Sequence, residues 1–184
     1  ELHDQGIEDT LLVPLYPQYA MSSYETVVVK TLEEQRRHFP EMKITTLPAF
    51  YNQDDYIKVL GDHIAKELED FEYDQLLFSY HGIPERHIRK SDPTKFHCKI
   101  DGSCCSINSV AHHSCYRHQC YTTTKLVGEH LQLEEDKILS KKDETNVVSF
   151  EDYEEILLNT FWCSSKITII GKEFFDGSVF SGGK

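Results

Sequence analysis

The sequence predicts an α/β fold built on a parallel sheet. Three short apolar segments, residues 10–15, 43–47 and 75–80, each run into a turn, as buried strands do. The stretches 22–38 and 54–71 between them have the length and apolar spacing of helices. Because a strand–helix–strand order with helix-length crossovers requires parallel strands, the expected topology is βαβαβ.

Each expected helix has its own local signals. The sequence SSYE at residues 22–25 has the spacing of a capping box, which predicts a helix that runs to about His38, shortly before Pro40. In the second helix the apolar side chains fall on one face: Ile57, Leu60, Ile64, Leu68 and Phe71. These faces are expected to cover the sheet.

The expected topology brings three loops to one edge of the sheet. The carboxyl ends of parallel strands meet at the same edge, where open α/β sheets place their ligands. The loop at Tyr16-Pro17-Gln18-Tyr19, the turn after Leu47 and His81 follow the three strands. We therefore expect them to form one site.

The rest of the chain shows weaker patterning. Residues 82–114 have neither helical nor strand periodicity, 115–131 reads as a helix, and 166–170 as a strand. We expect residues 141–144 to be a polar linker and 150–161 a short helix. The expected organisation is an α/β domain over 1–136, with a cysteine-rich active-site loop at 82–120, and a divergent tail over 137–184.

Composition limits the class of partner and the compartment. The 184 residues carry 19 Lys and Arg against 31 Asp and Glu, a formal charge of −12. This charge argues against nucleic acid, and it gives no sign of peripheral membrane contact. The sequence shows no secretory signal and no apolar run long enough to span a bilayer. We expect a cytoplasmic protein, or one in an organelle matrix.

Five cysteines lie close together in the sequence, at Cys98, Cys104, Cys105, Cys115 and Cys120. The spacing lacks the paired C-x2-C knuckles of zinc ribbons, whereas four thiolates suffice for a [2Fe–2S] cluster. Free thiols, a disulfide staple and a mixed site with nearby histidines remain open alternatives. Cys163, alone in the tail, is expected to pack as a small hydrophobe.

Three stretches resemble motifs of the ferrochelatase family, the metal chelatases (lyases) that insert iron into porphyrin. Residues 13–19 read VPLYPQY, and residues 77–86 read LFSYHGIPER around His81. The stretch CYRHQC at 115–120 is similar to the CYRxQC segment of bacterial members that carry their cysteines in an internal loop. The resemblance covers about residues 7–135.

The resemblance implies a Rossmann-like half of a two-half chelatase fold and a role in heme biosynthesis. It assigns His81 to catalysis, as a ligand of the substrate iron or an acceptor of pyrrole protons. It places Tyr16, Gln18 and Tyr19 among the residues that bind protoporphyrin. The implied [2Fe–2S] ligands are the internal cysteines Cys98, Cys105, Cys115 and Cys120, with Cys104 as the alternate to Cys105.

The sequence departs from the family after Leu133. The later motifs, including the segment with the family's catalytic glutamate, have no counterpart, and residues 138–142 read ILSKK. The fold is therefore expected to be truncated relative to the family, and ferrous iron insertion to be incomplete in this chain. The alternative is a non-catalytic remnant or binding module that holds an iron–sulfur cluster or a porphyrin. An exposed cleft wall would favour self-association.

Overall fold

The computed structural model describes residues 2–69, 73, 75–99, 101–134, 137–139 and 165–170. The chain divides into two compact units. The first comprises Glu1–Tyr51 and Ile83–Gln119, and the second comprises Asn52–Gly82 and Cys120–Lys184. The expected linker at 141–144 and helix at 150–161 lie outside the described residues.

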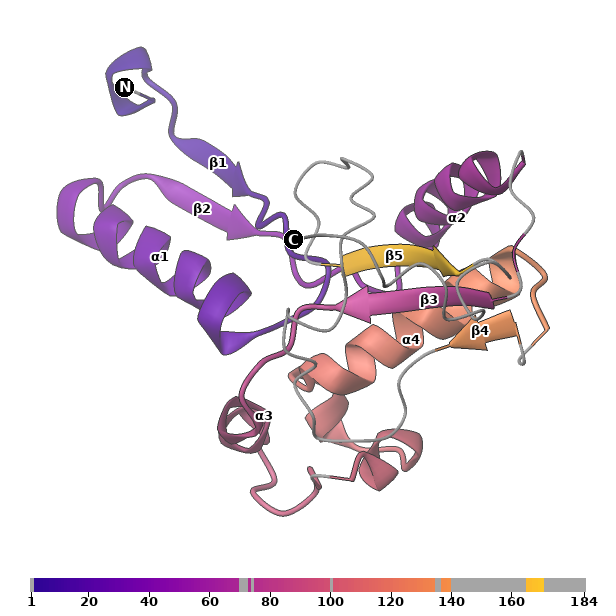
Figure 1. The fold of residues 1–184 in the computed structure, drawn as a ribbon. Helices are drawn as coiled ribbons and strands as arrows, with labels where there is room; N and C mark the ends of the chain where they lie inside the picture. Colours follow the sequence, from indigo (N-terminus) through magenta and orange to yellow (C-terminus); the bar gives the residue numbers. More distant parts are fainter. Residues whose placement is uncertain are drawn as a thin grey trace, which may run out of the picture. The chain divides into compact units, whose positions relative to one another are not determined.

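The first unit contains a two-stranded parallel sheet and its crossover helix (Figure 1). Strand β1 (Asp9–Leu12) pairs with β2 (Lys43–Thr46) so that Asp9 lies opposite Lys43. Helix α1 (Thr26–His38) joins the two strands, as the sequence predicts. The strand expected at 10–15 was predicted to be buried, and this was wrong, because exposed and half-buried residues alternate along β1.

The expected capping box does not form. Met21–Glu25 is a π-helical turn that leads directly into α1, and its N-cap residue, Ala20, has no side chain able to accept a capping hydrogen bond. The Thr26 hydroxyl instead donates to the Met21 carbonyl oxygen at 2.7 Å. The helix was thus predicted at the right place for the wrong local reason.

The region from Gly82 to Ser114 holds more structure than its lack of periodicity indicates. It contains helix α3 (Glu85–Ser91) and two short 3-10 turns, Ser103–Ser106 and Val110–His113. A seven-residue helix spans about two turns, too few for an apolar period to show in the sequence.

The second unit centres on β3 (Gln75–Tyr80), the middle strand of a three-stranded sheet. It pairs in parallel with β4 (Ile138–Leu139) and antiparallel with β5 (Ser165–Ile170). Helices α2 (Asp54–Leu68) and α4 (Tyr116–His130) confirm the two predicted helical segments to within a few residues.

The order of the first five elements confirms the α/β class, but the single sheet expected for the three strands does not form. Strand β3 has β4 on one edge and β5 on the other, so both of its edges are paired without β1 or β2. The strand predicted at 166–170 is confirmed as part of β5.

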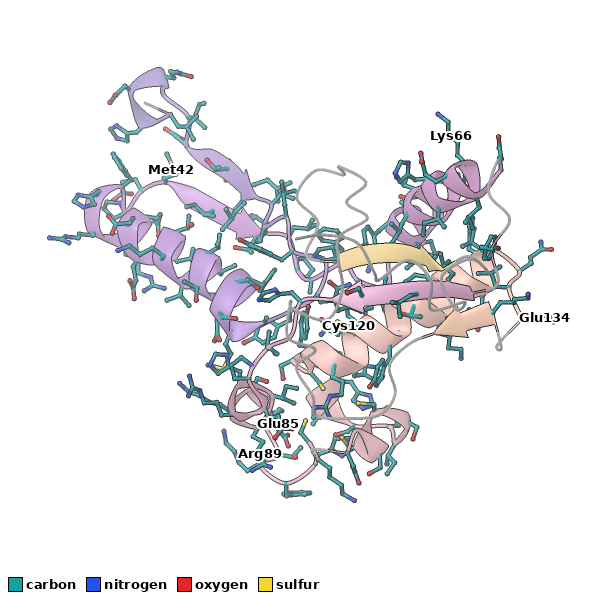
Figure 2. All side chains as sticks on the ribbon, viewed as in Figure 1. Met42, Lys66, Glu85, Arg89, Cys120 and Glu134 are labelled. Atoms are coloured by element: carbon teal, nitrogen blue, oxygen red, sulfur yellow. The ribbon has the colours of Figure 1, made fainter. Side chains whose placement is uncertain are left out.

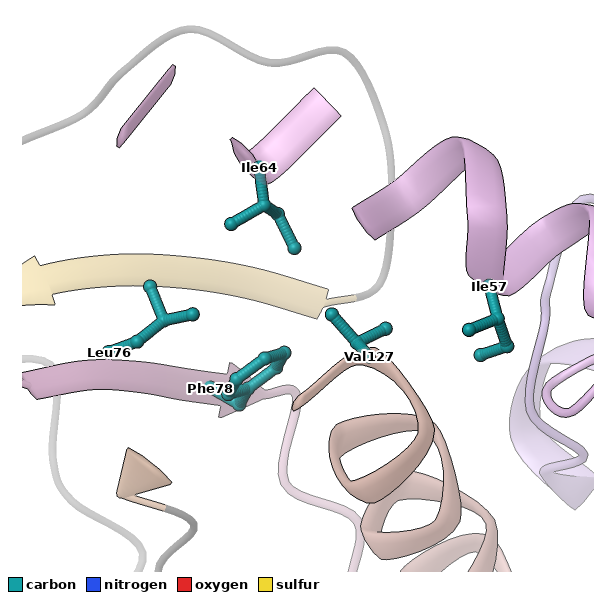
Figure 3. Packing of buried hydrophobic residues seen from close by; sticks show 5 residues of the cluster. All are labelled: Ile57, Ile64, Leu76, Phe78 and Val127. Atoms are coloured by element: carbon teal, nitrogen blue, oxygen red, sulfur yellow. The ribbon is translucent and has the colours of Figure 1, made fainter. Parts of the chain in front are cut away.

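The core of the second unit lies between α2, β3 and α4 (Figure 3). Leu76 and Val127 are fully buried, and the cluster also includes Ile57, Ile64 and Phe78. Leu60 and Leu68 pack against it, which confirms the predicted apolar face of α2 except at Phe71, which lies outside the described residues. No helix among the described residues is both long enough and apolar enough to cross a membrane.

Helix α2 approaches α4 closely at Gly61. A Cβ atom on Gly61 would lie 2.3 Å from Cδ2 of His130, whose Nε2 donates to the Asp62 carboxylate at 2.9 Å. We expect Gly61→Ala to lower the free energy of unfolding by about 1 kcal/mol, because the displaced ring and lost ion pair outweigh the gain in helix propensity.

Urea unfolding measures this effect, and Gly128→Ala is the matched control. A Cβ there would lie 2.3 Å from Cδ1 of Ile138, the flexible end of its side chain, and 3.6 Å from Cγ1 of the same residue. If Gly61→Ala were as stable as Gly128→Ala, the proposed close packing of His130 would be contradicted.

Candidate functional site

The loop after β1 carries the three residues predicted to bind substrate. Gln18 is buried, with 1% of its surface exposed, whereas Tyr16 and Tyr19 are half-buried. The Pro17 carbonyl accepts a hydrogen bond from the Phe50 N–H at 2.9 Å, which ties this loop to the segment that follows β2. Two of the three loops predicted to form one site therefore do lie together.

Tyr19 is held as a neutral phenol. Burial, together with a hydrogen bond to the Glu25 carboxylate, raises the pKa of its hydroxyl. The Tyr24 ring lies 5.7 Å from the Tyr19 ring, centroid to centroid. The Tyr24 hydroxyl in turn donates to the Leu47 carbonyl at 2.8 Å. The side chains of Tyr19 and Tyr24 are thus held in place by direct contacts.

His81 follows the last residue of β3, as the sequence predicts, and its side chain is exposed. Strand β3 itself is anchored nearby, where the hydroxyls of Tyr80 and Thr124 lie 2.9 Å apart. His81 belongs to the second unit and Tyr16 to the first. The expected convergence of their loops stays a prediction.

A buried aspartate, Asp92, precedes the first cysteine of the cysteine-rich loop. The Asp92 carboxylate accepts hydrogen bonds from the backbone N–H groups of Thr94, His97 and Cys98 at 2.8–2.9 Å, and from the Thr94 hydroxyl at 2.7 Å. Its burial would raise its pKa, but these hydrogen bonds outweigh burial and lower the pKa to about 2. Asp92 is therefore an anion at neutral pH and holds the backbone that leads to Cys98.

The thiols of the first unit gather around Cys115. Cys98 and Cys105 both form thiol hydrogen bonds with it. The hydrogen bond from Cys105, assisted by those from the His118 backbone and Cys98, lowers the pKa of Cys115 to about 6 even though burial opposes the charge. Burial raises the pKa of Cys98 to about 12. Cys115 is thus the most acidic of these three thiols.

The remaining two cysteines of the motif are buried. The Cys104 sulfur accepts a hydrogen bond from the Lys99 N–H at 3.2 Å, and Cys120 lies on α4 (Figure 2). None of the five cysteines from Cys98 to Cys120 forms a disulfide, so the disulfide alternative is wrong for them.

Two histidines hold the backbone of the adjacent pair Cys104 and Cys105, and a third packs on one of them. Nε2 of His97 lies 3.2 Å from the Cys104 carbonyl oxygen, and Nδ1 of His118 lies 2.9 Å from the Cys105 carbonyl oxygen. The His112 ring stacks on that of His118, with 3.5 Å between their centroids. These ring nitrogens are directed at carbonyl oxygens, which favours a supporting role over the mixed metal site that the sequence left open.

Gln119, which sequence reasoning missed, joins the two halves of the first unit. Its Oε1 accepts from the Tyr19 N–H at 2.6 Å, and its Nε2 donates to the carbonyl oxygens of His112 and His113 at 3.1 and 2.9 Å. The side chain is fully buried. Two signals were available: Gln119 is the glutamine of the CYRxQC segment, and it lies four residues after Cys115.

The thiols are the residues best suited to a metal or cluster, since deprotonated cysteine is the ligating form. Within the described ranges, no group of three or more His, Cys, Asp or Glu side chains is arranged to hold a metal ion.

Comparison with known proteins gives a consistent result. The sequence profile of the family described as Ferrochelatase matches residues 1–140. The chain is 43% identical over 132 residues to a ferrochelatase from Opitutus terrae, which covers 72% of this chain and 38% of the relative. It is 35% identical over 136 residues to a ferrochelatase from Pseudomonas syringae pv. tomato, covering 74% of this chain and 40% of the relative.

A ferrochelatase from Porphyromonas gingivalis is 38% identical over 128 residues, which are 70% of this chain and 37% of the relative. The chain thus spans about two fifths of the length of the relatives that it matches. No solved structure matches.

Proposed function

The chain belongs to the ferrochelatase family, and we propose that it takes part in heme biosynthesis by inserting ferrous iron into protoporphyrin. The observation that carries this proposal is the position of His81. It follows β3 directly, its side chain is exposed, and it lies within the part of the chain that the family profile matches.

The chemistry requires a base and a metal ligand in one place. Insertion removes two pyrrole protons from the porphyrin and delivers a divalent ion to the ring nitrogens. A neutral imidazole serves either purpose near neutral pH. We assign this role to His81, with ferrous iron and protoporphyrin as substrates.

The porphyrin-binding role falls to the loop at residues 16–19. The half-buried rings of Tyr16 and Tyr19 offer apolar surface with a polar tip, which suits a flat macrocycle that carries carboxylates. Gln18, whose side chain is buried, supports this loop from within.

We also propose a [2Fe–2S] cluster held by Cys98, Cys105, Cys115 and Cys120. Three of the four thiols support the proposal, because those of Cys98 and Cys105 form hydrogen bonds with Cys115 and the pKa of Cys115 is lowered. When bound, the cluster supplies covalent cross-links within the loop. Cys104 remains the alternate ligand, although its sulfur already accepts the Lys99 N–H.

Anaerobic reconstitution with iron and sulfide tests the cluster. We expect the absorbance and electron paramagnetic resonance spectra of a [2Fe–2S] centre from the chain, and their loss in Cys115→Ser, because serine replaces the central thiolate. Cys163→Ser is the control and should keep the spectra. Equal iron and sulfide content in Cys115→Ser and the unsubstituted chain would contradict the proposed ligand set.

The second function that we propose is a binding module that holds a porphyrin or an iron–sulfur cluster without turnover. The hydrogen bonds of the Cys98 and Cys105 thiols with Cys115 favour it, because they suit cluster binding and do not involve His81. We also propose residues 1–136 as the chelatase-like domain and 137–184 as a divergent tail. Both functions suit a cytoplasmic location.

Iron insertion separates the two functions. If the chain inserts iron, turnover of protoporphyrin under anaerobic conditions should be lost in His81→Ala, because the base and iron ligand are removed. His63→Ala, which replaces an exposed histidine on α2, should keep turnover. Porphyrin binding without turnover by the unsubstituted chain would favour the binding module, and turnover by His81→Ala would contradict the role of His81.

Self-association is a further expectation. Exposed apolar side chains in the described part of the first unit include Leu11 and Leu15, which are 60% and 74% exposed. We expect light scattering to show a mass above that of the monomer at high concentration, because such surface is stabilised by burial. A monomer at every concentration would contradict this expectation.

A further inference from the structure

A hollow of about 400 Å³ lies in the first unit, outside the cysteine group. Met21 and Ser22, from the turn before α1, line one part of it, and Arg86, His87 and Lys90, from α3, line the other. This volume is within the range of small-molecule sites in proteins, about 300–1,000 Å³. The lining contains no carboxylate.

Two cations at this hollow lack a counter-ion in the part of the chain that the structure describes. Arg86 and Lys90 stand four residues apart on α3 and so share one face of it. Among the described residues neither forms an ion pair, whereas Lys30, at the same spacing from Glu34, does. Unpaired cations around a hollow form an attractive site for an anion.

The surrounding segment is basic although the chain is acidic. Residues 85–99 carry five Lys and Arg but only two acids, Glu85 and Asp92, in a chain of formal charge −12. The Asp92 carboxylate is already engaged by the backbone of its own loop. The positive charge near the hollow is therefore not neutralised by its neighbours in sequence.

The polar groups at the hollow suit a phosphate. Arg86 offers a planar fork of donors, Lys90 a compact charge and Ser22 a hydroxyl. Nδ1 of His87 is buried and has no hydrogen-bond partner among the described residues, so it remains available to an anion. Two full charges and donors of four kinds match a doubly charged, tetrahedral group better than a carboxylate.

We propose that this hollow binds the phosphate group of a soluble small molecule, whose apolar part rests on Met21. The proposal goes beyond iron insertion, since it assigns no role to His81, the cysteines or the porphyrin.

Calorimetric titration of the full chain with inorganic phosphate, in a chloride buffer without porphyrin, tests the site. We expect saturable binding of one phosphate per chain. The double variant Arg86→Gln, Lys90→Gln should bind at least about tenfold more weakly, because two charge-assisted contacts are lost. The control is Arg89→Gln, which removes one charge from the same helix (Figure 2). Arg89 lines a different surface depression, together with Cys98 and Arg117. This variant should change the affinity for phosphate by less than about twofold.

Several outcomes would overturn the proposal. They are the absence of phosphate binding, an equal effect of Arg89→Gln and the double variant, or equally strong competition by acetate. Sedimentation with phosphatidylglycerol vesicles distinguishes the source of the phosphate, with phosphatidylcholine vesicles as the control. We expect the chain to stay in the supernatant, whereas vesicle binding that the double variant abolishes would assign the site to a lipid headgroup and overturn the soluble source.

Discussion

Replacing Gln119 with leucine should lower the free energy of unfolding by about 3 kcal/mol, because three backbone groups lose the partner that this fully buried side chain supplies. The amide accepts from the Tyr19 N–H and donates to the carbonyl oxygens of His112 and His113. Leucine has a similar volume but can neither accept nor donate. Urea unfolding followed by circular dichroism measures the loss.

The matched control is Gln35→Leu. The Gln35 amide also donates to backbone carbonyls, those of Phe39, Pro40 and Met42, but the first two of these contacts are exposed to solvent and only the third is half-buried. We expect a loss below about 1 kcal/mol, because water replaces the amide. Equal losses in the two variants would contradict the claim that Gln119 joins the substrate loop to the cysteine-rich loop.

Replacing Asp92 with asparagine should lower the free energy of unfolding at pH 7 by about 2 kcal/mol, because a buried anion that accepts several backbone hydrogen bonds becomes a neutral amide. The loss should loosen the segment between Thr94 and Cys98, whose N–H groups the carboxylate holds. Urea unfolding at a series of pH values measures it.

The pH dependence has a definite sign. The pKa of Asp92 in the folded chain is lowered to about 2, below the value of about 3.9 expected when the chain is unfolded. The stabilisation is therefore complete at pH values well above 4 and is lost as the pH falls from about 4 towards 2. The difference between Asp92→Asn and the unsubstituted chain should shrink over that range.

Asp101→Asn is the control for this prediction. Asp101 also accepts from a backbone N–H and a hydroxyl, both of Ser103, but it is exposed. We expect little change in stability from it. A difference between Asp92→Asn and the unsubstituted chain that stays constant from pH 7 to pH 2 would contradict the assigned pKa.

Local patterns in the sequence predicted most of the helices and strands. The apolar face of α2 was readable because Ile57, Leu60 and Ile64 recur at the helical period and do face the core. Helix α3 was missed because its one buried apolar residue, Ile88, gives no period. The short apolar run at β1 was mistaken for a buried strand, since run length alone does not show which faces are covered.

Strand pairing and the supports of the loop depend on contacts between residues far apart in sequence. Strand β3 pairs with β5, more than 80 residues later, and no local pattern encodes that choice. Gln119 contacts Tyr19 across 100 residues of sequence. The cysteines themselves were predictable because their residue type carries the chemistry, whereas the supporting roles of His97 and His118 follow only from the folded backbone.

The most direct test of the proposed function is a chimera. Residues 1–134 replace the matched segment of the Opitutus terrae ferrochelatase, so that the remaining length of the family fold is present. We predict anaerobic insertion of ferrous iron into protoporphyrin by the chimera, and none by the same chimera with His81→Ala. A folded chimera that binds protoporphyrin but does not insert iron, or one whose activity survives His81→Ala, would contradict the account.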